Sequence, residues 1–207
     1  LSSSSAASDV YKRQAKVGAL VLAWAILVGV PLGCLAAFKR GKLTDSILRV
    51  ICTLGISMPS FVVASVLLVT LTGNNALNLF PSIFDPSQGW RAYVLPCFAL
   101  GFYPMCYTAR QTRSAMLDSL SQEYIKTARA KGLKNKKIIF KHALRNALIP
   151  VITILGPILV NLMTGTMVVE KICSVPGLGK LLINSILSND YNIILCLLYT
   201  SDAADEE

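Results

Sequence analysis

The chain alternates long apolar segments with short basic ones, and this alternation limits its fold more than any other feature. Residues 15–38 read AKVGALVLAWAILVGVPLGCLAAF, with Lys16 as the only charge. At 1.5 Å per residue, a helix of this length reaches roughly 35 Å, enough to cross the hydrocarbon layer of a membrane. Further apolar spans are expected at about 46–72, 92–107 and 147–169. The sequence therefore predicts an all-α fold, a polytopic transmembrane helical bundle that is truncated at both ends.

The composition favours a membrane protein over a soluble one. Apolar residues make up 54% of the chain and charged residues 15%, with a mean hydropathy of +0.57. About 25% of residues are charged in an ordinary soluble domain. The net charge of +9 would also suit a nucleic-acid-binding protein, but the basic residues stand between apolar spans without an aromatic recognition motif. Positive-inside topology explains the same charge, so membrane lipid is an expected partner and nucleic acid is not.

The most basic segment runs from Arg110 to Arg145 and lies between two apolar spans. It contains ten of the chain's twenty Lys and Arg residues against only Asp118 and Glu123. Such a segment should lie on the cytoplasmic side of the membrane. The basic turn KRGK at 39–42 then falls on the same side.

Helical spacing within this segment predicts two short amphipathic helices joined at a glycine. Tyr124 and Ala128 are four residues apart before Gly132, and apolar residues keep helical spacing over 140–147 after it. Gly132 is the expected C-cap of the first helix. A solvated basic loop that merely sets topology is the alternative interpretation.

Three residues are expected to mark the ends of helices around this pair. Ser119, followed three residues later by Gln122, can form a capping box for the first short helix. Pro150 can open the helix that follows the pair.

Breaks within the apolar spans suggest a path for a transported solute. Ser57, Met58 and Pro59 interrupt the second span at mid-depth, where a local break either lines a cavity or is a packing kink. In the fourth span, Asn161 and Thr164 are the polar candidates for the same path.

No residue pattern supports catalysis, a metal site or a bound cofactor. Gly177–Leu181 resembles a phosphate-binding loop, but Ser174 and Leu181 occupy positions where that motif needs Gly and Ser or Thr. His142 is the only histidine and has no metal-ligand or triad partner in its neighbourhood. The six cysteines form no C-x-x-C pair and are expected to act as small buried hydrophobes, with only Cys173 accessible in an outer loop.

The two ends of the chain differ in character from the rest. Residues 1–14 and 196–207 resemble translated adapter sequence and are expected to be non-native tails. The expected domain is then an internal fragment, residues 15–195.

Several motifs occurring in order resemble the permease subunits of type-I ABC importers. The motifs are VPLGCLAAFKRG from residue 30, TARAKGL at 127–133, HALRNALIPV at 142–151 and VPGLGKLL at 175–182. The resemblance covers nearly all of 15–195 and is strongest to the dipeptide and oligopeptide branch, which some nickel importers share. The family's cytoplasmic loop usually begins Glu-Ala-Ala, whereas this sequence has Lys126-Thr127-Ala128 in that register.

This resemblance implies a transport subunit, not an enzyme, in the bacterial inner membrane. Residues 118–147 would form the coupling (EAA) loop that docks on a separate ATPase, where ATP and Mg²⁺ bind. The residues expected to couple to the ATPase are Glu123, Tyr124, Ala128, Arg129, Gly132 and Pro150. The other implied partners are a second homologous permease and an extracytoplasmic substrate-binding protein. Short peptides are the expected cargo; import of nickel or another solute, and a non-transport scaffold or channel, are the alternatives.

Overall fold

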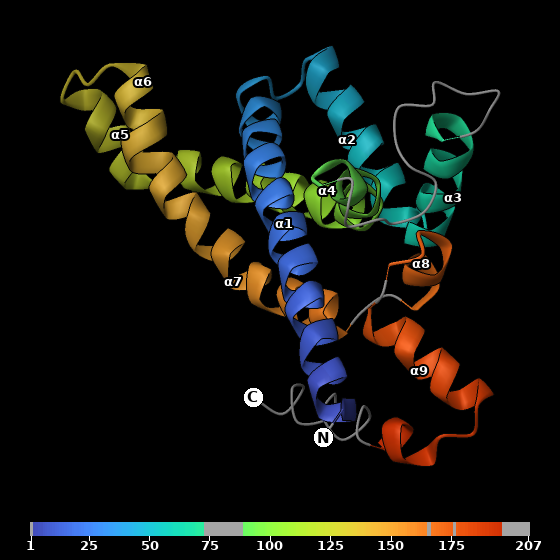
Figure 1. Cartoon of the computed structure of the whole chain (residues 1–207). Coiled ribbons are helices and arrows are strands. Elements are labelled where there is room, and N and C mark those ends of the chain that lie inside the picture. The colour runs from blue at the N-terminus through green and yellow to red at the C-terminus, as the bar shows by residue number, and fades with distance from the viewer. Residues whose placement is uncertain (1, 73–88, 165–166, 176, 196–207) are drawn as a thin grey trace. The chain divides into compact units, whose positions relative to one another are not determined.

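The chain is all-helical over the residues that the computed structural model describes, which are 2–72, 89–164, 167–175 and 177–195 (Figure 1). The helices, in chain order, are α1 (Ser2–Phe38), α2 (Leu43–Ser57), α3 (Ser60–Leu71), α4 (Arg91–Ser121), α5 (Glu123–Ala130), α6 (Asn135–Lys137), the π-helix η2 (Ile138–Ala143), α7 (Leu144–Thr164), α8 (Met167–Ile172) and α9 (Leu178–Leu187). The predicted fold class is confirmed.

The chain forms two compact units. Unit 1 comprises Leu1–Leu22, Pro59–Phe102 and Pro157–Glu207, and unit 2 comprises Ala23–Met58 and Tyr103–Gly156. The basic segment and the predicted coupling residues all belong to unit 2.

Among the described residues, two helical segments, Gln14–Phe38 and Ile138–Leu162, are long and apolar enough to cross a membrane. The first confirms the predicted span at 15–38. The broken pair α2 and α3 makes a third candidate if it is counted as one span. The total of four spans in this chain stays a prediction.

The break predicted in the second span is present. α2 ends at Ser57, and Met58 and Pro59 both have extended backbone before α3 begins. Proline disfavours helical geometry in the residue before it, which explains why the helix stops here. α4 runs as one helix from Arg91 to Ser121, so Pro96 and Pro104 do not break it.

The prediction that Pro150 opens a helix is wrong. Pro150 lies inside α7, which begins at Leu144 directly after η2. Proline inside a helix lacks the N–H that would bond to the carbonyl four residues earlier, here that of Asn146, and its ring crowds that carbonyl. A long helix that is anchored on both sides of this position tolerates that loss.

In unit 2, α1 and α4 approach closely through two glycines four residues apart. A methyl group on Gly33 would lie 2.5 Å from the carbonyl oxygen of Ala109, and one on Gly29 would lie 2.8 Å from that of Met105. Glycines at this spacing let two helix backbones come into contact, as in small-residue interfaces between membrane helices. This role was not predicted from the sequence.

An ion pair with a buried carboxylate joins the first turn of α2 to α4 beside these glycines. Arg113 donates from Nε and Nη2 to the two carboxylate oxygens of Asp45, at 2.6 and 2.8 Å. The backbone N–H of Gly41 also donates to Asp45, whose side chain is 1% exposed. The hydrogen bond to Asp45 raises the pKa of Arg113 above its ordinary value, so the guanidinium stays charged.

We expect Gly33→Ala to destabilise the protein while Gly156→Ala does not. The first adds a methyl group against α4 backbone and should cost roughly 1–3 kcal/mol of unfolding free energy. Gly156 has nothing within 4 Å of an added methyl group, so alanine there should be neutral or slightly stabilising. Thermal unfolding of the full-length protein in detergent measures both. Equal midpoints for the two variants would contradict the close α1–α4 contact.

Candidate functional site

The predicted helix–Gly–helix element is present in unit 2 as α5, a glycine turn, α6 and η2. Gly132 has φ +72° and follows the last residues of α5, a left-handed geometry that favours glycine. The N–H of Leu133 donates to Ala128 O at 3.3 Å and that of Gly132 to Arg129 O at 2.9 Å. These two bonds define a Schellman motif, which ends α5 and reverses the chain. The predicted capping role of Gly132 is confirmed. We call residues 123–143 the coupling element, after the role that the sequence predicts for them.

A small apolar core fixes the coupling element to the rest of unit 2. Ile125 of α5 and Ile138 of η2 are each 1% exposed and pack in one cluster with Met116 of α4. The other buried members of this cluster are Ala37, Ala115, Ala128, Ala143 and Ala147. Alanines at most of these positions bring the helix backbones close together, so α5 and η2 are anchored on α4 and on the end of α1.

A serine of α4 links both helices of the element by hydrogen bonds. Ser119 Oγ donates to the carbonyl oxygen of Ala143 at 3.0 Å. Because its one proton is used there, the Tyr124 hydroxyl is the donor in the 2.6 Å bond between Tyr124 and Ser119. The prediction that Ser119 caps α5 is wrong: Ser119 lies inside α4, and the N-cap residue is Gln122, without a side-chain cap bond.

The six residues of η2 form a π-helix in the middle of the element. It runs without interruption from α6 into α7, so the apolar segment Ile138–Leu162 begins inside the coupling element. π-helical turns are rare and occur often at functional sites. His142 is part of this turn and is half-buried. No group of residues that could hold a metal ion occurs in the part of the chain that the structure describes.

A groove of about 370 Å³ lies beside the element, between the end of α4, the start of α5 and α7. Its lining includes Gln111, Ser119, Gln122, Tyr124, Asn146 and Pro150. Two of the predicted coupling residues, Tyr124 and Pro150, therefore meet at one groove although they are far apart in sequence.

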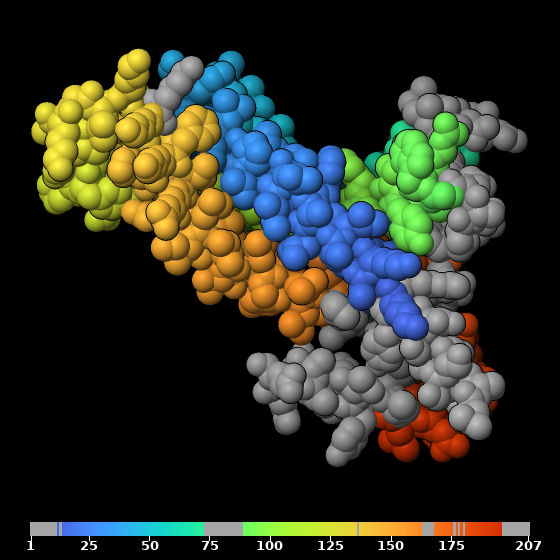
Figure 2. Space-filling model, turned by 60° about the vertical axis from the view of Figure 1, so that its left-hand side comes forward, coloured from blue at the N-terminus to red at the C-terminus, as the bar shows by residue number. Residues whose placement is uncertain are grey.

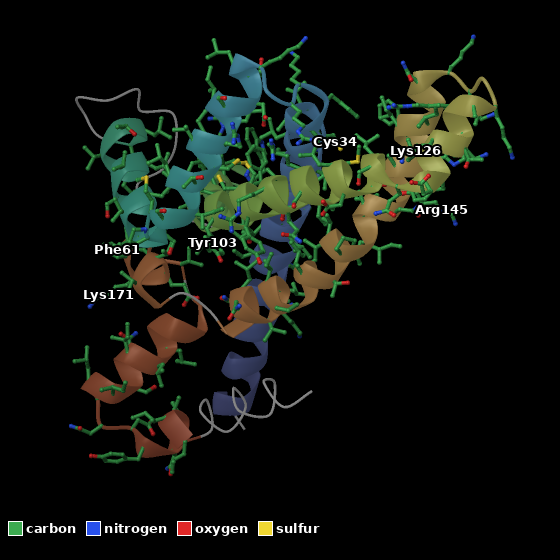
Figure 3. The ribbon with its side chains drawn as sticks, turned by 180° about the vertical axis from the view of Figure 1, so that it is seen from behind. Cys34, Phe61, Tyr103, Lys126, Arg145 and Lys171 are labelled. Carbon is green, nitrogen blue, oxygen red and sulfur yellow. The ribbon has the colours of Figure 1, made fainter. Side chains whose placement is uncertain are left out.

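The other predicted coupling residues lie on α5 or just after it. Glu123 has a side chain that is 83% exposed and pairs with Lys126 at 2.7 Å. Arg129 and Gly132 are also exposed. Ala128 differs, because it is 6% exposed and faces the apolar core of unit 2. Figure 2 shows α5 (yellow) at the outer surface of unit 2. Figure 3 shows Lys126 of α5 and Arg145 of α7 in the same part of the molecule.

The candidates for a solute path divide between the two units. Ser57 and Met58 are exposed in unit 2, at the end of α2. Pro59 and Asn161 are exposed in unit 1. Thr164 is the last residue of α7, and its side chain lies outside the described residues. Their role in a path stays a prediction.

Two glycines of the motif VPGLGKLL lie against a buried carboxylate, that of Glu170, which no local sequence pattern singles out. Glu170 of α8 accepts the N–H of Gly179, in the first turn of α9, at 2.8 Å. Negative charge is favourable at this end of a helix. Gly177 lies so close to the carboxylate that any side chain there would overlap it. The two glycines thus let the backbone approach the Glu170 carboxylate closely.

The expectation that Cys173 is accessible is wrong. Cys173 follows α8 and is 3% exposed. Burial raises the pKa of its thiol to about 11, so it stays protonated and unreactive at neutral pH.

Fold and site together define an α-helical membrane component with a packed helix–Gly–helix element next to an apolar segment. The chain belongs to the family described as binding-protein-dependent transport system inner membrane component, whose model matches residues 29–201.

Curated relatives agree with this assignment. The chain is 43% identical over 183 residues to the dipeptide transport system permease protein DppB of Bacillus subtilis, which covers 87% of this chain and 57% of the relative. It is 38% identical over 188 residues to the oligopeptide transport system permease protein OppB of Salmonella typhimurium, covering 88% and 59%. The chain thus spans somewhat more than half the length of the curated relatives it matches.

We expect Ser119→Ala to loosen the coupling element, because it leaves the Ala143 carbonyl and the Tyr124 hydroxyl without their partner. The cost should be roughly 1–3 kcal/mol, seen as faster amide hydrogen exchange in α5 and η2. Ser121→Ala is the matched control, because Ser121 bonds only to Asp118 O on the surface. Unchanged exchange in the Ser119 variant would contradict the linking role of this serine.

Proposed function

We propose that the chain is part of a permease subunit of an ATP-driven importer that moves short peptides across the bacterial cytoplasmic membrane. Separate ATPase chains would supply the energy, and the coupling element would dock on them. A second homologous permease and an extracytoplasmic substrate-binding protein would complete the transporter. The family match over 29–201 is the observation that carries this proposal.

The names of the relatives support short peptides, rather than nickel, as the cargo. Those compared above are named for dipeptide and oligopeptide transport, and they share 38–43% identity with this chain. The sequence also lacks a Walker A motif, which supports assigning ATP hydrolysis to partner chains.

The geometry of the coupling element suits a docking role. Its outer face carries Glu123 and Arg129 in solvent, whereas its inner face is buried against α4 and α1. The groove beside Tyr124 and Pro150 offers a partner a concave surface next to this face. A partner bound here would contact charged groups at the rim and one aromatic side chain near the centre.

The same geometry supports transmission of force into the membrane. η2 and α7 form one helix that begins in the element and becomes the apolar segment ending at Leu162. Movement of α5 against the ATPase would be passed to this helix through Ile125 and Ile138, because packed interfaces shift as units. A loop that only set the membrane topology would need no such core.

We expect Gly132→Asp in the full-length parent to abolish ATPase association and peptide uptake while membrane insertion stays intact. A side chain at φ +72° strains the turn by roughly 1–2 kcal/mol, and the new acid changes the charge of an exposed docking surface. Co-purification of the ATPase and uptake of a labelled peptide are the measurements.

Gly89→Asp is the matched control for this experiment. Gly89 has φ +62° and open space around it, but it lies in unit 1, between the spans predicted at 46–72 and 92–107 and hence on the side opposite the basic segments. This variant should keep both ATPase association and uptake. Unchanged uptake in the Gly132 variant would contradict the coupling role and favour a non-transport scaffold.

A further inference from the structure

A basic cavity of about 350 Å³ opens between α1, α2 and α4 in unit 2. Arg49 of α2 and both Arg110 and Arg113 of α4 contribute to its lining. Apolar side chains form another part of the wall, namely Leu32, Ala36 and Leu48. Gln111 and Ser114 of α4 line both this cavity and the groove beside the coupling element, but the three arginines line only the cavity.

The charges around the cavity are not balanced. Arg113 is neutralised by Asp45, which accepts two hydrogen bonds from it. Arg49 lies 3.8 Å from the same carboxylate and its side chain is 55% exposed. Arg110 makes no ion pair with any residue that the structure describes; its guanidinium lies 5.9 Å from the Tyr107 ring centre. Three arginines against one aspartate leave a net charge of +2.

The surroundings of the cavity are those of a membrane interface. It lies between the last turns of α1 and the middle of α2, the two helices that are joined by the basic turn 39–42, which is predicted to be cytoplasmic. On the outer faces of α2, Leu43, Val50 and Leu54 are all more than half exposed. Arginines at the edge of an apolar surface of this kind can reach lipid head groups.

We propose that this cavity binds the phosphate of an anionic phospholipid from the cytoplasmic leaflet. Arg49 and Arg110 donate to the phosphate oxygens, because the planar guanidinium matches phosphate geometry. Leu32 and Leu48 contact the upper part of an acyl chain. A zwitterionic lipid would bring its own cation and leave the +2 charge uncompensated, and free phosphate would make no use of the apolar wall. The site does not depend on which solute the transporter carries.

The test is native mass spectrometry of the complex that contains the full-length permease, titrated with phosphatidylglycerol or phosphatidylcholine. The intact complex should bind phosphatidylglycerol at least about tenfold more tightly than phosphatidylcholine. Arg49→Gln together with Arg110→Gln should lower the affinity for phosphatidylglycerol by about tenfold or more, because two charge-assisted contacts are lost.

A charge-matched control separates the cavity from general surface charge. Lys39→Gln together with Arg40→Gln removes two exposed cations from the adjacent turn and should change the affinity by less than about threefold. Arg110→Lys, which keeps the charge but not the planar fork, should be intermediate. This single variant also serves if the double variant does not fold.

Three results would overturn the proposal. The first is an equal loss of phosphatidylglycerol affinity in the cavity double variant and the control double variant. The second is an unchanged affinity in both. The third is inorganic phosphate or glycerol phosphate binding as tightly as intact phosphatidylglycerol, which would show an anion site without a lipid.

Discussion

The burial of Ile125 and Ile138 against Met116 is the interaction on which the rest of unit 2 depends. Each such side chain contributes roughly 1.5–3 kcal/mol when it is removed from water. Without this core, α5 and η2 would be two short amphipathic helices, and helices of that length are marginal in isolation. The core therefore holds a highly charged segment in one packed arrangement, which the proposed docking on an ATPase requires.

Two further contacts hold together the helices on which this core packs. The glycines of α1 let its backbone lie against α4, and the Asp45–Arg113 pair fixes the turn beyond them. A buried ion pair adds little net stability, because both charges lose water, but breaking it leaves one charge unpaired and is costly. We infer that this pair sets the register of α2 against α4, next to the cavity that we assign to lipid.

The sequence was informative where local chemistry decides the structure. A left-handed glycine ends α5, a proline stops α2, and an apolar run with Lys16 as its only charge forms the first candidate span, all as predicted. Ser119 was misassigned because a capping pattern looks the same at a surface helix start and inside a helix that packs on η2. The accessibility of Cys173 was mispredicted for a related reason, since only the packed structure shows that this residue is buried.

Other features depend on residues far apart in the chain and left no local signal. Asp45 and Arg113 are 68 positions apart, and no local pattern around either residue predicts that the two form an ion pair. Glu170 is enclosed by a loop that follows it, so its role requires the fold of α8 and α9. The π-helical turn of η2 also left no local signal, because IIFKHA has no spacing that distinguishes it from an α-helix.

The most direct test of the account is crosslinking from the coupling element in the assembled transporter. In a background without the native cysteines, Arg129→Cys places a thiol on the exposed face of α5, and Ala128→Cys places one in the buried core. A short thiol-specific crosslinker should join position 129, but not position 128, to the ATPase chain. No crosslink from position 129, or one to the extracytoplasmic binding protein, would contradict the central claim.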